Sequence, residues 1–133
     1  MLVLTNADFS ELLYVNRTYQ EVWGRTLESL YAEPKSWLEG IHAEDRGHIE
    51  EHLQRLIGGE RVDSLEYRLV RPDGSSAWVA LRGYPIFDAQ GHVYRLVGSG
   101  HDITQRKQAV LRFRELLEFA PDAMVVVNQD GKL

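Results

Sequence analysis

The hydrophobic pattern of this chain changes from a helical period to a strand period at two consecutive glycines, and that change limits the folds open to it. Before residues 58–59, Ile49, Leu53 and Leu56 recur at the spacing of one helix face, and charged residues occupy the opposite face. The glycines then end the helical pattern. The sequence therefore predicts an amphipathic helix over roughly residues 44–57, with an apolar stripe that has to be buried.

After the glycines, apolar residues alternate with polar ones, which is the period of a half-buried strand. Leu65, Tyr67 and Leu69 show this alternation first. Further strands are predicted at 76–87 and 92–104, each preceded by a turn that contains Asp and Gly. A three-stranded meander needs an apolar cover on one face. We therefore expect an α+β fold, an antiparallel sheet with short helices and one longer helix covering one face.

The first forty residues predict smaller elements. Apolar stretches at 1–4 and 12–15 flank a turn-forming segment, which is typical of a short antiparallel hairpin. Asn16 is suited to cap a short helix that ends at Gly24, because glycine tolerates the positive φ of a helix C-terminus. Proline and glycine interrupt the pattern over 25–40, so only short helical turns are expected there.

Composition excludes several classes of function. The chain has 133 residues and a net charge of -5, and its basic residues are not gathered into the positive stripe that nucleic acid or anionic lipid requires. It has no cysteine, which excludes disulfides, thiolate metal sites, a cysteine nucleophile and a cysteine–flavin adduct. No apolar run approaches the roughly 20 residues that span a bilayer, so we expect a cytoplasmic domain without direct membrane contact.

Beyond residue 104 the pattern is helical again. One apolar seam at heptad spacing consists of Ile103, Val110, Phe113, Leu117 and Ala120. A proline ends this helix, and a strand-forming stretch follows at 123–127. The predicted organisation is a domain at 1–104, a helical linker at 105–120 and the first strand of a truncated second domain at 121–133. We expect the linker helix to pair with a second copy, giving a homodimer.

Four sequence blocks agree in order and spacing with a known family. They are Y-V-N-R-T-Y-Q-E-V-W-G at 14–24, W-L-E-G-I-H-A-E-D-R at 37–46, L-E-Y-R-L-V-R-P-D-G-S-S-A-W-V at 65–79 and D-I-T at 102–104. Together they resemble the PAS domain, with D-I-T in the place of its closing PAC motif. The resemblance covers about residues 1–104, and residues 113–133 resemble the beginning of a second PAS domain.

The resemblance implies a module of signal transduction rather than an enzyme. Such a domain senses a small ligand or a partner and passes a conformational signal through its exit helix. The expected recipient is an effector in the same chain, a histidine kinase of a bacterial two-component system or a diguanylate cyclase. The alternative is a dimerisation and spacer module without a ligand. No motif places a nucleophile beside a base, so this fragment is expected to be non-catalytic.

The fold of the family commonly encloses a pocket between helix and sheet. Trp23, Tyr67, Trp78 and Tyr84 are the candidates to line it, although aromatic residues at strand spacing are typical of an ordinary core. The junction at the end of the sheet is a second candidate site. The relay residues there are Asp102, Ile103 and Thr104. Asp102 is expected to accept a bond from an arginine on a neighbouring strand.

One histidine is a candidate cofactor ligand. In heme-binding PAS domains an imidazole on the long helix ligates the iron, and His48 stands near that place. The polar residues around His48 favour a ring that faces solvent instead. His48 and His52 lie on one helix face but lack the order and third ligand of a zinc site. We expect no heme, flavin or metal.

Overall fold

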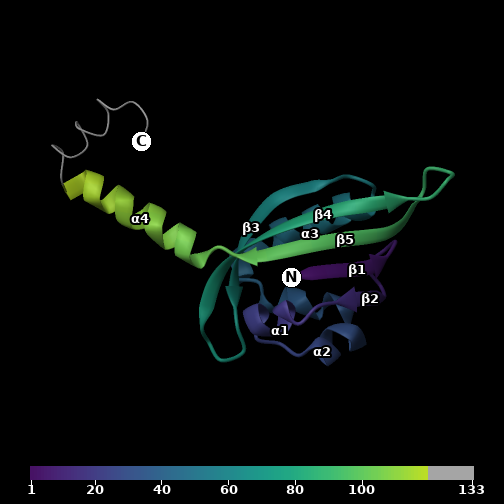
Figure 1. The fold of residues 1–133 in the computed structure, drawn as a ribbon, viewed down its shortest axis with the longest axis horizontal. Coiled ribbons are helices and arrows are strands. Elements are labelled where there is room, and N and C mark those ends of the chain that lie inside the picture. The colour runs from purple at the N-terminus through teal and green to yellow at the C-terminus, as the bar shows by residue number, and fades with distance from the viewer. Residues whose placement is uncertain (120–133) are drawn as a thin grey trace. The chain divides into compact units, whose positions relative to one another are not determined.

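A five-stranded antiparallel sheet organises residues Met1–Ile103 of the computed structural model, which describes residues 1–119 (Figure 1). Across the sheet the strands are β2 (Leu12–Val15), β1 (Leu2–Asn6), β5 (Val93–Asp102), β4 (Ser76–Phe87) and β3 (Val62–Val70). The predicted hairpin thus extends the predicted meander, because β1 pairs with β5. The α+β class and the antiparallel sheet are confirmed.

Short helices fill the connection between β2 and β3. They are α1 (Thr18–Trp23), α2 (Leu27–Ala32), the 3₁₀ helix η1 (Pro34–Gly40) and the longer α3 (Ala43–Ile57). Thr26 caps α2, since its hydroxyl accepts a hydrogen bond from the Ser29 amide. Pro34 opens η1, where a missing N–H leaves no helical bond unmade. Helices α2 and η1 are the short helical turns expected over residues 25–40.

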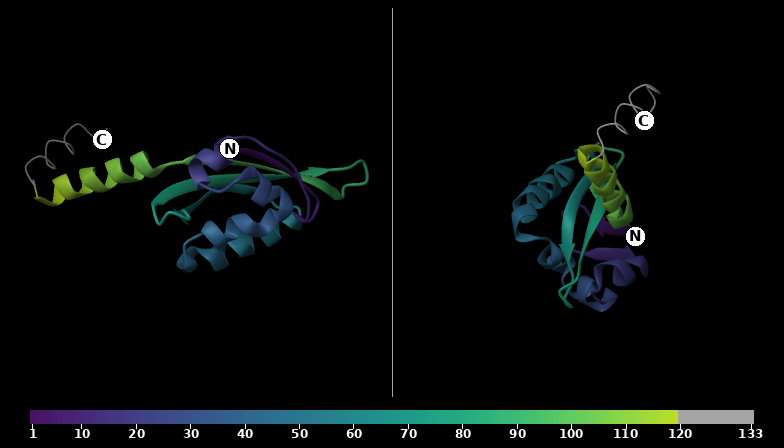
Figure 2. Two further views of the ribbon diagram at one scale, coloured as in Figure 1. Left: turned by 90° about the horizontal axis from the view of Figure 1, so that it is seen from below. Right: turned by 90° about the vertical axis from the view of Figure 1, so that its left-hand side faces the viewer.

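Helix α3 covers one face of the sheet, as its apolar stripe predicts (Figure 2). Ile49, Leu53 and Leu56 are its buried residues. The first turn of α3 is fixed to β3 by Asp45, which accepts bonds of 2.8 and 3.0 Å from the backbone N and Nε of Arg68. These bonds from Arg68 hold the pKa of Asp45 below its ordinary value.

The start of α1 differs from the prediction. Asn16 does not cap this helix: its side-chain oxygen accepts from the Leu2 amide at 3.1 Å and so ties the end of β2 to β1. The prediction that Asn16 caps α1 is therefore wrong, because its side-chain oxygen is bonded within the β1–β2 hairpin instead. The end of α1 is as expected, because Gly24 has the left-handed φ of 70°.

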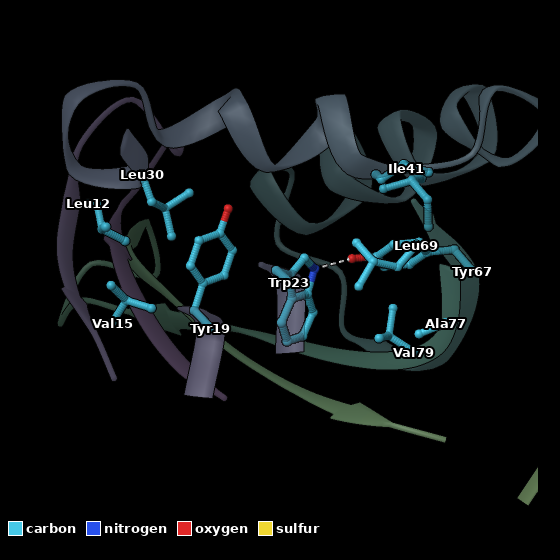
Figure 3. Packing of buried hydrophobic residues seen from close by; sticks show 11 residues of the cluster. Leu12, Val15, Tyr19, Trp23, Leu30, Ile41, Tyr67, Leu69, Ala77 and Val79 are labelled. Atoms are coloured by element: carbon cyan, nitrogen blue, oxygen red, sulfur yellow. Dashed lines mark hydrogen bonds between the residues drawn. The ribbon is translucent and has the colours of Figure 1, made fainter. Parts of the chain in front are cut away.

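The larger core cluster lies between the sheet and the helices (Figure 3). Its most enclosed side chains include Tyr19, Trp23 and Tyr67, none of them more than 1% exposed. The indole N–H of Trp23 donates to the Tyr67 hydroxyl at 2.6 Å, the dashed line in Figure 3. This bond satisfies a buried donor that would otherwise cost free energy.

The exit helix α4 (Thr104–Phe119) forms a unit of its own. Its exposed large apolar residues are Val110, Leu111, Phe113 and Leu116, with exposed fractions between 46% and 64%. Ile103, the first residue of the predicted seam, is instead buried in the sheet domain, where its amide donates to the Trp78 carbonyl at 2.8 Å. Ala120 and the predicted strand at 123–127 lie outside the described residues.

Candidate functional site

A cavity of about 90 Å³ lies between the helices and the sheet. Side chains from α1, α2, η1, α3, β3 and β4 line it, and most of them are apolar. Gly83 and Gly98, which face each other across β4 and β5, form part of its wall on the sheet. The core is therefore hollow at the place where α3 crosses the strands.

Two residues that line this cavity, Tyr19 and Trp37, each carry a buried hydrogen-bonding group without a protein partner among residues 1–119. The Tyr19 hydroxyl and the Trp37 indole nitrogen make no hydrogen bond within residues 1–119. Figure 3 shows the Tyr19 hydroxyl beside Leu30, while Trp23 on the same helix is bonded to Tyr67. Native proteins rarely leave such groups unpaired, because each costs about 1–3 kcal/mol.

Burial also determines the ionisation state of the Tyr19 hydroxyl. Desolvation raises the pKa of Tyr19 to about 12, and the charges of Arg25 and Glu39 have smaller, opposite effects. Tyr19 therefore keeps its proton over the physiological range.

Aromatic rings form much of the cavity wall. Tyr19 and Trp23 stack with ring centroids 5.6 Å apart, and Phe9 lies 6.2 Å from Trp37. Phe9 stands in the β1–β2 loop with a φ of 63°, a left-handed conformation that costs a residue with a side chain about 1–2 kcal/mol. The side chain of Phe9 is only 8% exposed, and it lines the cavity.

Of the aromatic residues predicted to line a pocket, Trp23 lines the cavity and three do not. Tyr67 is wholly buried behind Trp23 and holds its indole. Trp78 and Tyr84 point to the opposite face of the sheet, because successive residues of a strand alternate and Val79 and Gly83 face inward. There the Arg68 guanidinium lies over Trp78, at 5.9 Å from its ring centroid.

The sequence reasoning missed Phe9, Tyr19 and Trp37. Tyr19 precedes Trp23 by four residues, so the helical period that placed Trp23 could also have placed Tyr19 on the same face. Trp37 lies in η1 and Phe9 in a loop, where no hydrophobic period exists to predict which way a ring points.

The histidine considered as a heme ligand does not face this cavity. His48 is exposed, whereas His52, one turn further along α3, lines the cavity. Their rings are 4.3 Å apart, and Nδ1 of His52 donates to the His48 carbonyl at 2.9 Å.

Within residues 1–119, no three His, Asp or Glu side chains gather closely enough to hold a metal ion. In the same range, no helix combines the length and the apolar character needed to cross a membrane.

Arg71, which follows β3, connects the cavity helix α1 with the end of the sheet. Its Nε donates to the Val22 carbonyl at 2.7 Å, and its Nη2 lies 3.9 Å from the Asp102 carboxylate. Asp102 thus has an arginine partner, but Arg71 lies outside the strands rather than on the neighbouring strand that was expected, and at 3.9 Å the two form an ion pair and not a hydrogen bond. Trp23 also packs against β5, the strand of Asp102. Its ring lies so close to Gly100 that a Cβ at this position would be only 2.8 Å away.

The sheet, the covering helices and the cavity between them define an α+β domain of the sensor type. A family model described as PAS fold matches residues 12–99, and the chain belongs to this family. The uncharacterized protein y4lL of Sinorhizobium fredii is 36% identical over 96 residues, which are 72% of this chain. The chain spans 11% of the length of that relative.

Solved structures agree with the family assignment. A domain of a light and redox sensing histidine kinase from Haloarcula marismortui is 35% identical, with a TM-score of 0.68 over 77% of this chain and 88% of that one. The N-terminal domain of a diguanylate cyclase with PAS/PAC sensor from Marinobacter aquaeolei shares the fold, with a TM-score of 0.70, 20% identity and coverage of 80% and 96%. A light-oxygen-voltage domain studied with a flavin analogue also shares it, at a TM-score of 0.63, 19% identity and coverage of 86% and 85%.

Proposed function

We propose that this chain is a sensory and relay domain. It senses a small ligand or a partner and passes the signal through α4 to an effector in the same polypeptide, a histidine kinase or a diguanylate cyclase. In this proposal residues 1–104 are the sensor, 105–120 the linker helix and 121–133 the beginning of a second domain. The domain itself carries out no reaction and works in the cytoplasm.

The observation that carries the proposal is the position of Arg71. Helix α1 contributes Tyr19 and Trp23 to the cavity wall, and the Val22 carbonyl on that helix is bonded to Arg71. The same guanidinium pairs with Asp102, two residues before the first residue of the exit helix. A shift of α1 caused by an occupant of the cavity would therefore change the partner of Asp102. The segment Asp102, Ile103 and Thr104 is the relay site that we propose.

The second candidate function is a ligand-free dimerisation and spacer module. The exposed apolar residues of α4, Val110 and Phe113 among them, favour pairing with a second copy. Burying them stabilises an assembly by about 25 cal/mol per Å² before the cost of association. A homodimer through α4 is compatible with both functions. Only the sensor requires that a change in the cavity reaches Ile103.

Amide exchange at Ile103 tests this requirement. Leu53→Ala enlarges the cavity, and Leu12→Ala removes an equally buried leucine that does not line it. Both changes cost about 2–5 kcal/mol, so their global effects are matched. The sensor function predicts that Leu53→Ala accelerates exchange at Ile103 more than Leu12→Ala does, and that Arg71→Gln removes the difference. Equal exchange in both leucine variants would favour the spacer.

A further inference from the structure

We propose that His42 makes the first turn of α3 sensitive to pH, because its imidazole caps the helix only while the ring is neutral. The cap is present while the ring is unprotonated and is lost when the ring takes up a proton. The fold thus contains a pH-dependent contact at the start of the helix that covers the cavity. This proposal does not rest on the sensor function, since it concerns one hydrogen bond at the end of α3.

His42 occupies the N-cap position of α3 and uses its ring as the capping group. Its backbone is non-helical, with a φ of -51° and a ψ of 137°, and its Nδ1 accepts a hydrogen bond of 3.1 Å from the Glu44 amide. The first amides of a helix have no partner within the helix, and Ser, Thr, Asp and Asn are the residues that usually supply one. Here an imidazole nitrogen takes the place of their side-chain oxygen.

Only one form of the imidazole can act as this cap. In the neutral ring one nitrogen carries the proton and the other accepts, so the bond at Nδ1 of His42 requires the proton on Nε2. The protonated ring donates from both nitrogens and accepts nothing, so it cannot bind the Glu44 N–H. Its positive charge would also stand at the positive end of the helix dipole. Histidine is the side chain whose charge ordinarily changes between about pH 5 and 8, so the cap is lost within that range.

Charged groups next to His42 come from α3 and β3. The Arg68 carbonyl accepts a hydrogen bond of 2.9 Å from the His42 amide, and the Arg68 guanidinium donates to the carboxylates of Glu44 and Asp45. Arg46 donates to the backbone carbonyl that precedes His42, at 3.1 Å. The bonds from Arg68 hold the pKa of Asp45 below its ordinary value. A proton taken up here above about pH 5 therefore goes to the imidazole and not to Asp45.

Loss of the cap loosens the first turn without releasing the helix. The Asp45 carboxylate still accepts from the backbone N and Nε of Arg68 and so holds this turn on β3, while the Glu44 N–H becomes open to water. Ile49, further along α3, is buried in the larger core cluster and should not respond. The expected effect is therefore local, and it separates a lost cap from general unfolding.

Two NMR measurements on the unaltered protein test the proposal. The imidazole ¹⁵N resonances report the tautomer, and we expect an unprotonated Nδ1 and a protonated Nε2 for His42 at about pH 8. The second measurement is the protection factor of the Glu44 amide, its exchange rate in an unstructured peptide divided by its rate in the protein. It should fall about fivefold as His42 takes up its proton, the factor expected for one N-cap. Protection of the Ile49 amide should stay within about twofold.

Two asparagine variants separate the cap from other effects of pH. His42→Asn keeps an acceptor that does not titrate, and asparagine is among the best N-cap residues, so Glu44 protection should become independent of pH. His48→Asn removes an exposed histidine of the same helix and should leave the fall of about fivefold intact. If His42→Asn does not fold, the tautomer and the protection factors of the unaltered protein decide alone.

Three outcomes would overturn the proposal. A protonated Nδ1 on neutral His42 would show that the ring does not accept from the Glu44 amide. Unchanged protection of that amide across the titration of His42 would show that the bond does not hold the helix end. The same loss of protection in His42→Asn would assign the effect to another group.

Discussion

The same substitution, Tyr to Phe, is expected to have opposite effects at two positions of one core. Tyr67→Phe removes the acceptor of the Trp23 indole, whose bond is 2.6 Å long, and leaves a buried N–H unpaired. That loss costs about 1–3 kcal/mol. Tyr19→Phe removes a hydroxyl that has no partner among residues 1–119, so it abolishes a desolvation cost and keeps the packed ring. It should stabilise the protein by up to about 1 kcal/mol.

Urea denaturation of ligand-free protein, refolded from denaturant, measures both effects. With an m-value of about 2 kcal/mol/M, Tyr67→Phe should lower the midpoint by about 0.5–1.5 M and Tyr19→Phe should raise it by up to about 0.5 M. Tyr84→Phe serves as the surface control and should move the midpoint little. A clear loss of stability in Tyr19→Phe would refute the reasoning, because it would show that the hydroxyl has a partner that stabilises the fold.

Two further predictions concern an ion pair and an interface. Bonds from Arg68 depress the pKa of Asp45, so the stability that they contribute is present above its ordinary pKa of 3.8 and is lost as the pH falls through the lower folded value. Asp45→Asn should therefore destabilise the protein by about 1–2 kcal/mol at pH 7, and the difference should shrink in acid denaturation below pH 3.8. In analytical ultracentrifugation, Phe113→Glu and Leu117→Glu should weaken dimerisation, while Gln108→Glu, an exposed polar position of the same helix, should not. Identical monomers in all samples would rule out α4 as an interface of this chain.

Periodicity predicted the elements that have one buried face. The helix expected over 44–57 is α3 (Ala43–Ile57), and the strand expected at 76–87 is β4 (Ser76–Phe87). These predictions succeed because burial of a single face imposes a regular repeat on the residue types. The third strand ends at Asp102 rather than at residue 104, since α4 begins at Thr104.

The residues of the candidate site were harder to predict from the sequence than the fold, for two physical reasons. Both faces of β4 carry apolar residues, so alternation alone does not tell whether Trp78 or Val79 faces the core. The polar groups that matter most, on Tyr19 and Trp37, are defined by the absence of a partner in three dimensions. No spacing of residues encodes such an absence, and Trp37 lies in η1, which has no hydrophobic repeat.

The central claim, that the cavity is coupled to the exit of the sheet, is tested most directly at the Ile103 amide, which is bonded to Trp78. Leu53→Ala, which enlarges the cavity, should accelerate exchange of this amide at least about twofold relative to Leu12→Ala, an equally buried leucine that does not line it. The change should persist in Arg61→Gln, an exposed arginine paired with Asp63, and disappear in Arg71→Gln. If exchange at Ile103 is the same in Leu53→Ala and Leu12→Ala, a change in the cavity does not reach the exit of the sheet and the relay account is wrong.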